Sequence, residues 1–151
     1  MKLSNTPQDD AGLSDGAGRE LCYVTNEDGS YTTELSIGWE PKNTAIIEAW
    51  RDIKDQVEEI VEQINLGRKS PLQYYMALNL MNTTLLSQIS GIAKWRVRRH
   101  FKPKYFKKLK PSTLKKYAEV LKIEPTLLSN SDLFKNINVT EEIFKKTGVK
   151  L

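Results

Sequence analysis

Residues 86–97 read Leu86-Ser87-Gln88-Ile89-Ser90-Gly91-Ile92-Ala93-Lys94-Trp95-Arg96-Val97, and this stretch decides the fold. Small Ser87 follows apolar Leu86, Gly91 stands four residues after the serine, and apolar Val97 stands six residues after the glycine. A small residue lets two helices cross closely, and a glycine adopts the left-handed conformation of a tight turn. Val97 is then expected to anchor the second helix in the core. The spacing predicts two short helices joined by a turn.

Boundary signals on both sides of this stretch predict a bundle of five short helices. The expected starts are Ser70-Pro71, Asn82 or Thr83, about Ala93, Pro111 and Pro125. Proline is tolerated at the first helical position, and asparagine, threonine and serine are good N-caps. The third helix is expected to stop before Pro103, because the residue preceding a proline is pushed out of the helical region. Leu72, Tyr75, Met76 and Leu80 recur at helical spacing in the first helix. In the third helix Ala93, Val97 and Phe101 are expected to face inward.

Residues Ser70 to Asn130 resemble the lambda-repressor-like, Cro/CI-type helix-turn-helix family. Leu86, Ser87, Gly91 and Val97 occupy the positions of that family's motif, and residues 111–121 are similar to its fourth helix. The chain departs from the family pattern in three places. Ser90 and His100 stand where apolar residues are usual, and residues 102–110 make a longer link to the fourth helix. The resemblance implies that the second motif helix enters the major groove of DNA.

The outer face of that helix is basic, and the resemblance makes it the DNA-reading surface. Arg98 and Arg99 are expected to contact bases, since a guanidinium binds guanine O6 and N7 together. Trp95 and Lys94 are further candidates for base contact. Lys94 could instead contact phosphate. For Trp95 the favoured alternative is that the N-terminal hairpin covers its side chain. His100 is expected to be packed or to contact phosphate. Phosphate contacts are expected from Arg96, Lys102, Lys104, Lys107 and Lys108.

The charge distribution separates the chain into an acidic and a basic part. Residues 1–62 contain 5 Lys/Arg and 14 Asp/Glu. Residues 63–118 contain 13 Lys/Arg and no Asp/Glu, and residues 119–151 contain 5 Lys/Arg and 5 Asp/Glu. A stretch of this length without a carboxylate suits a surface that meets polyphosphate. An acidic protein or membrane headgroups would also suit it, and the alternative is an ordinary solvated helix face. Tyr74, Tyr75, Tyr105 and Phe106 are expected to be core residues rather than base-stacking platforms.

The N-terminal part predicts a β-hairpin and a long amphipathic helix. Residues 1–19 lack periodicity and are expected to form a disordered tail. Residues 21–25 and 31–37 are β-prone runs on either side of Asp28-Gly29, a strong hairpin signal. Tyr31, Thr33, Leu35 and Ile37 alternate onto one face. A lone hairpin is only marginally stable, so it is expected to pack on the helix that follows.

That helix is expected to begin after Pro41, with Asn43 or Thr44 as N-cap, and to end near Leu66 before Gly67. Its apolar residues recur at heptad-like spacing: Ile46, Trp50, Ile53, Val57, Ile60 and Ile64. This seam favours packing within the chain or dimerisation with a second copy. The expected organisation is a hairpin and helix over 20–67, a helix-turn-helix domain over 68–130 and an extension over 131–151 that contains a short helix from Val139 to Lys146.

Composition restricts the function. The single cysteine permits no intrachain disulfide, and no apolar run is long enough to span a membrane, so a cytoplasmic location is expected. One histidine and one cysteine cannot form a Cys/His zinc cluster, and no phosphate-binding glycine pattern follows a strand. Neither a cofactor nor enzymatic activity is therefore expected. The sequence favours a transcription regulator that binds double-stranded DNA. An RNA-binding protein and a protein-interaction module remain the alternatives.

Overall fold

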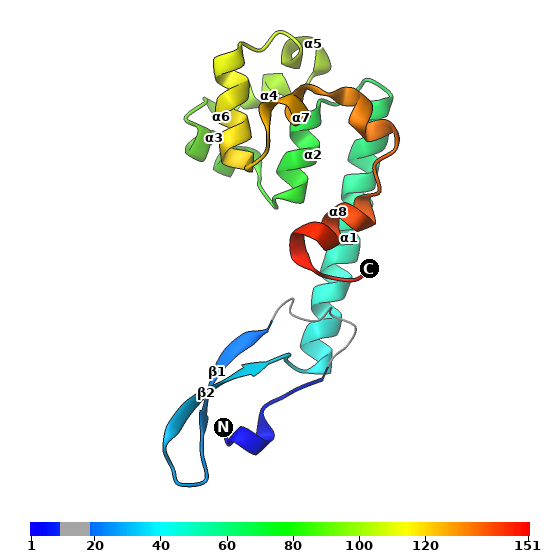
Figure 1. Cartoon of the computed structure of the whole chain (residues 1–151). Coiled ribbons are helices and arrows are strands. Elements are labelled where there is room, and N and C mark those ends of the chain that lie inside the picture. Colours follow the sequence, from blue (N-terminus) through cyan, green and yellow to red (C-terminus); the bar gives the residue numbers. More distant parts are fainter. Residues whose placement is uncertain (10–18) are drawn as a thin grey trace. The chain divides into compact units, whose positions relative to one another are not determined.

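The computed structural model describes residues 1–9 and 19–151, which are mainly helical with one two-stranded antiparallel sheet (Figure 1). The chain divides into two compact units. Unit 1 comprises Met1–Asp52 and Thr140–Leu151, and unit 2 comprises Ile53–Val139. The boundary falls inside the long helix α1 (Glu40–Asn65). Residues 10–18 of the expected disordered tail lie outside the described residues.

The hairpin of unit 1 is confirmed. β1 (Glu20–Thr25) pairs with β2 (Tyr31–Ser36) in a register that places Leu21 opposite Leu35. The N–H of Asn26 donates to the carbonyl of Ser30 at 2.9 Å and closes the turn. The face that carries Tyr31 and Leu35 is open, and these side chains are 83% and 51% exposed. The opposite face is the covered one, with Val24 only 1% exposed.

Residues 1–9 pack against the hairpin and the start of α1 within unit 1. They contain the 3₁₀ helix η1 (Leu3–Asn5), and the Ser36 hydroxyl donates to the Pro7 carbonyl at 2.6 Å. The side-chain amide of Asn43 donates to the carbonyls of Asp9 at 2.8 Å and Ile37 at 3.1 Å. Asn43 is therefore a buried tie between segments rather than the expected N-cap of α1, which begins at Glu40.

Helix α8 (Val139–Thr147) brings a later part of the chain into unit 1. The helix ends before Gly148, whose φ is +74°, as the sequence predicts. Beyond it, Val149 packs with Ile47 of α1 in a small apolar cluster. The partly buried residues around this cluster are Ile46, Trp50 and Leu151.

Unit 2 contains the predicted helices. They are α2 (Pro71–Leu78), α3 (Thr83–Ser90), α4 (Lys94–His100), α6 (Pro111–Leu121) and α7 (Pro125–Ser129). Two elements were not predicted, the short helix α5 (Pro103–Phe106) and the 3₁₀ helix η2 (Ser131–Lys135). α2 ends at Leu78, and Leu80 is 58% exposed with φ +53°.

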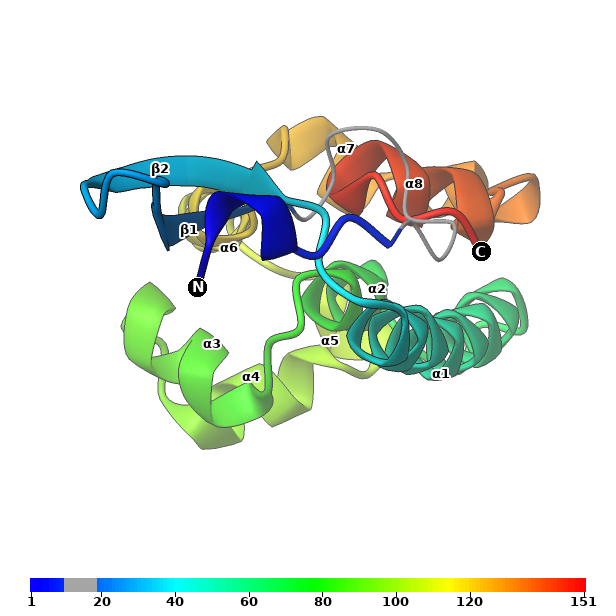
Figure 2. The same ribbon diagram turned by 90° about the horizontal axis from the view of Figure 1, so that it is seen from below.

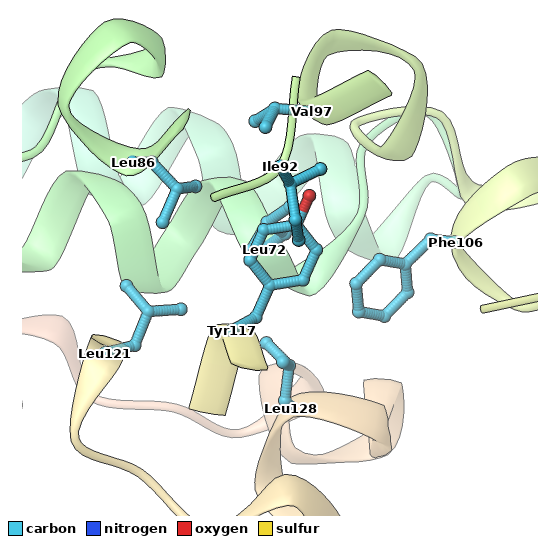
Figure 3. Close-up of a cluster of buried hydrophobic side chains, with 8 residues drawn as sticks. All are labelled: Leu72, Leu86, Ile92, Val97, Phe106, Tyr117, Leu121 and Leu128. Atoms are coloured by element: carbon cyan, nitrogen blue, oxygen red, sulfur yellow. The ribbon is translucent and has the colours of Figure 1, made fainter. Parts of the chain in front are cut away.

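One apolar cluster holds the helices of unit 2 together. Figure 3 shows its side chains, with the ring of Tyr117 from α6 in the middle and Leu86 and Phe106 on either side of it. Its members are Leu72, Leu86, Ile92, Val97, Phe106, Tyr117, Leu121 and Leu128. They come from α2, α3, the turn after α3, α4, α5, α6 and α7, so every helix from α2 to α7 is fixed by at least one buried side chain.

The apolar seam of α1 packs within the chain. Val57 and Ile64 are 0% and 6% exposed, so neither is available to a second copy. Ile46 and Trp50 lie against the Ile47 cluster of unit 1. The remaining members, Ile53 and Ile60, are partly buried and line a groove of about 470 Å³. Intrachain packing, the first of the two interpretations of this seam, is the one that these contacts support.

None of the helices in the described ranges is both long enough and apolar enough for a membrane span.

Candidate nucleic-acid interface

Helices α3 and α4 contact each other across a tight turn (Figure 2). The side-chain oxygen of Asn82 accepts from the N–H of Leu85 at 2.8 Å, which caps α3 as expected. Gly91 ends α3 with φ +66° and ψ +16°. A Cβ at Gly91 would have open space around it, so the left-handed backbone, and not crowding, is what requires glycine there.

Two serine hydroxyls hold the turn between these helices. The Ser87 hydroxyl donates to the carbonyl of Ile92 at 2.7 Å, which ties α3 to the start of the following segment. The buried Ser90 hydroxyl donates to the carbonyl of Leu86 at 2.6 Å. Ser90 occupies a position where the resembled family has an apolar residue. Its burial costs little here because the hydroxyl has a partner inside its own helix.

The far end of α4 is fixed by Ser70. The N–H of Ser70 donates to the carbonyl of Phe101 at 3.0 Å, and its hydroxyl donates to the carbonyl of His100 at 2.9 Å. The last carbonyls of a helix lack partners within the helix, so these bonds satisfy two of them. Ser70 therefore caps the end of α4, whereas the sequence assigned its side chain to the start of α2.

His100 points into unit 2 and is 7% exposed. Its Nδ1 lies 2.9 Å from the hydroxyl of Tyr117 on α6, with the two rings edge to face. Burial lowers the pKa of His100, and the nearby guanidinium groups of Arg96 and Arg99 lower it further. Burial also raises the pKa of Tyr117. His100 occupies a position that is apolar in the family pattern, and its burial is tolerated because the imidazole and the Tyr117 hydroxyl form a hydrogen bond with each other. Of the two roles expected for His100, the packed one is confirmed.

The opposite face of α4 is open to solvent and basic. The exposed residues are Lys94, Trp95, Arg96, Arg98 and Arg99, followed by Lys102 beyond the end of the helix. The ammonium of Lys94 donates to the hydroxyl of Thr84 at 2.5 Å and links the start of α4 to the start of α3. Within unit 2 no side chain covers the indole of Trp95, which is 65% exposed. Ala93, expected inside, is also exposed, whereas Val97 is fully buried as predicted.

Helix α5 continues the basic surface beyond α4. Phe106 is 6% exposed and anchors α5 in the core of unit 2. The ring of Tyr105 lies under the guanidinium of Arg99, with Cζ 4.2 Å from the ring centroid. Tyr105 was expected only as a core residue. Its contact with Arg99, six residues earlier in the chain, has no signal in the sequence. The exposed lysines on and beside α5 are Lys102, Lys104, Lys107, Lys108 and Lys110.

Among the described residues, the cations of 63–118 form no ion pairs with carboxylates. The ion pairs of the described residues involve Lys42, Lys54, Lys135 and Lys145, none of which belongs to this stretch. The four cations of α4, which are Lys94, Arg96, Arg98 and Arg99, therefore keep donors available to an anionic ligand. Guanidinium groups suit guanine edges and phosphate, while the lysines beside α5 suit phosphate.

Comparison of the chain with models of protein families, with curated proteins and with solved structures gave no match.

Proposed function

We propose that the chain binds double-stranded DNA with sequence preference and acts as a transcription regulator. In this proposal α4 enters the major groove, with Arg98 and Arg99 on base edges and Trp95 beside a thymine methyl group. The lysines of α5 contact the flanking phosphates. The observation that carries the proposal is the exposed, carboxylate-free basic face of α4, which is held by a glycine turn against α3.

The shape of this surface favours duplex DNA over RNA. A helix that presents its side chains outward fits the wide major groove of B-form DNA, whereas the major groove of A-form RNA is too narrow to admit it. The two strands of the described sheet lie in the acidic part of the chain, so they do not form the basic sheet of the commonest single-strand RNA binders. Competition between duplex DNA and duplex RNA of equal length tests this preference directly.

The first experiment selects a preferred site from a pool of random-sequence 20-bp DNA duplexes. Fluorescence anisotropy then compares the selected duplex with a scrambled duplex for the full-length chain and its variants. Arg98→Ala and Arg99→Ala are each expected to lose about 1–3 kcal/mol on the selected duplex and much less on the scrambled one. Arg51→Ala is the matched control, because Arg51 is exposed on α1 within the acidic part of the chain.

Two results would contradict the proposal. Failure to enrich any sequence at about 0.1 M salt would leave no specific site for α4 to recognise. Equal losses of both arginine variants on selected and scrambled DNA would mean that α4 lies along phosphates and reads no bases.

A further inference from the structure

One face of the hairpin in unit 1 is apolar and exposed. In the register of β1 and β2, Leu21 lies opposite Leu35, Tyr23 opposite Thr33 and Thr25 opposite Tyr31. Directly opposite residues of an antiparallel pair share a face, so these six side chains form one surface, which we call the hairpin face. Its four large members, Leu21, Tyr23, Tyr31 and Leu35, are 62%, 76%, 83% and 51% exposed. Contiguous apolar patches of this kind on soluble proteins mark interaction sites.

The backbone under the hairpin face is well defined. The strands pair without a bulge from Glu20 opposite Ser36 to Thr25 opposite Tyr31. The turn is closed by the backbone bond from Asn26 to Ser30, and the Asp28 carboxylate accepts from the N–H of Ser30 at 2.9 Å. These hydrogen bonds restrict the backbone before a partner binds, which lowers the conformational entropy lost on binding.

The chemistry of the hairpin face selects the partner. None of its six residues is charged, so it offers nothing to a polyphosphate such as DNA. A second copy of the same face would cover it without removing any charge from water. Two-fold pairing of identical surfaces is also the commonest form of association among soluble proteins.

The exposed area is sufficient for a weak dimer. If each large side chain has roughly 150–250 Å² to bury, the four offer on the order of 500 Å² per copy at their observed exposures. Two copies would then bury about 1,000 Å², which is near the lower limit for a specific interface. The α1 seam offers less, because Val57 and Ile64 are already buried by their own chain.

We propose that the hairpin face is a self-association surface through which two copies of the chain form a two-fold dimer. This proposal goes beyond DNA binding and does not depend on it. An interface of this size is expected to dissociate in the range of about 10–100 µM, as weak and transient complexes do. Tyr23 lies in the middle pair of the face and Tyr31 in the pair next to the turn, and these two residues are its only aromatic members.

Sedimentation equilibrium of the full-length chain from about 5 to 500 µM tests the proposal. The double variant Tyr23→Glu/Tyr31→Glu is expected to weaken dimerisation at least a hundredfold, because it sets like charges against each other in the covered interface. Phe144→Glu is the matched control. It makes the same kind of change at an exposed aromatic residue of α8, outside the hairpin, and should leave the dimer unchanged. Circular dichroism melting curves establish that both variants fold.

Three outcomes would overturn the proposal: an unmodified chain that stays monomeric at 500 µM, a double variant that dimerises as strongly as the unmodified chain, or a Phe144→Glu variant that dissociates equally. If the double variant does not fold, Tyr31→Ser replaces it, since a side chain that is 83% exposed contributes little to the fold of the monomer. This milder change is expected to weaken dimerisation about tenfold, and an unchanged dimer would again refute the proposal.

Discussion

At the scale of single residues, unit 2 places polar side chains at positions that a helical wheel marks as apolar or neutral. His100 and Ser90 are buried because each finds a hydrogen-bond partner, Tyr117 in one case and the carbonyl of Leu86 in the other. Such partners lie on other elements or in other turns, and a periodicity of apolar residues does not reveal them. The same buried pair makes the stability of the chain sensitive to pH.

The free energy of unfolding is expected to fall as pH is lowered from about 7.5 through 6.5, where free histidine titrates. The pKa of His100 is lowered in the folded state by burial and by Arg96 and Arg99, so the unfolded chain binds the proton first and gains stability as pH falls. Urea unfolding at pH 7.5 and 5.5 measures the effect. His100 is the only histidine of the chain, and His100→Gln, which does not titrate, should remove the effect. An NMR titration that places its pKa above 6.5 would contradict this prediction.

Tyr105 is expected to position Arg99 for DNA binding. Stacking of the guanidinium on the ring at 4.2 Å leaves its in-plane N–H donors available to a ligand. Tyr105→Leu should therefore weaken binding to the selected duplex about two- to fivefold, while Tyr105→Phe, which keeps the ring, should bind nearly as well as the unmodified chain. In an Arg99→Ala background, Tyr105→Leu should have no further effect. Additive losses in that double variant would mean that Tyr105 acts separately from Arg99.

At the scale of elements, the sequence predicted where helices begin because the signals are local. Pro71, Pro111 and Pro125 each stand at the first position of a helix, and Asn82 caps α3. Helix α5 was missed although Pro103 carries the same signal, because the run of lysines around it suggested only a link. The sequence could not predict what the α1 seam packs against. The spacing of apolar residues is the same whether a helix packs within its own chain or against a second copy.

Substitutions at the ends of α3 and α6 are expected to change the stability of unit 2 in opposite directions. Both helices end in a left-handed residue, Gly91 with φ +66° after α3 and Lys122 with φ +55° after α6. Gly91→Ala is expected to destabilise unit 2 by about 1–2 kcal/mol, the cost of a left-handed L-residue. Lys122→Gly is expected to raise the stability by up to about 1 kcal/mol for the same reason. Both are measured by urea unfolding. A change of the same sign in both variants would show that contacts, and not backbone conformation, dominate at these positions.

At the scale of the whole molecule, charge is divided along the chain. The acidic residues 1–62 and the basic residues 63–118 meet within α1 and the segment that follows it. The division was evident from the sequence. The structure adds that the unit boundary at Asp52/Ile53 lies ten residues before the charge boundary, so residues 53–62 of α1 carry acidic groups into unit 2. A chain cut at Arg68 would therefore lose buried Val57 and Ile64 together with the acids.

DNA binding by the full-length chain is expected to weaken steeply with salt. If roughly five to seven cations of each subunit contact phosphates, log affinity should fall against log salt with a slope of about −5 to −6 per subunit. Anisotropy titrations of a scrambled duplex from 50 to 300 mM salt would measure the slope. A slope of about −1 would show that the lysines beside α5 do not contact phosphate.

The acidic residues of α1 should moderate this attraction. Glu59 and Glu62 are exposed, and Glu59→Gln/Glu62→Gln should therefore bind the scrambled duplex more tightly at low salt, with the gain disappearing as salt screens the repulsion. An equal gain at every salt concentration would mean that the variant changes the interface by some route other than charge.

The pairing of Ile47 with Val149 also bears on synthesis by the ribosome. Unit 2 is one continuous segment and can close once residue 139 has emerged, whereas unit 1 needs residues 140–151 as well as 1–52. At about 5–20 residues per second, Ile47 waits roughly 5–20 s for Val149, and the hairpin waits slightly longer. During that interval nascent chains on neighbouring ribosomes would display the same uncovered apolar side chains to one another, so self-association could begin before translation is complete.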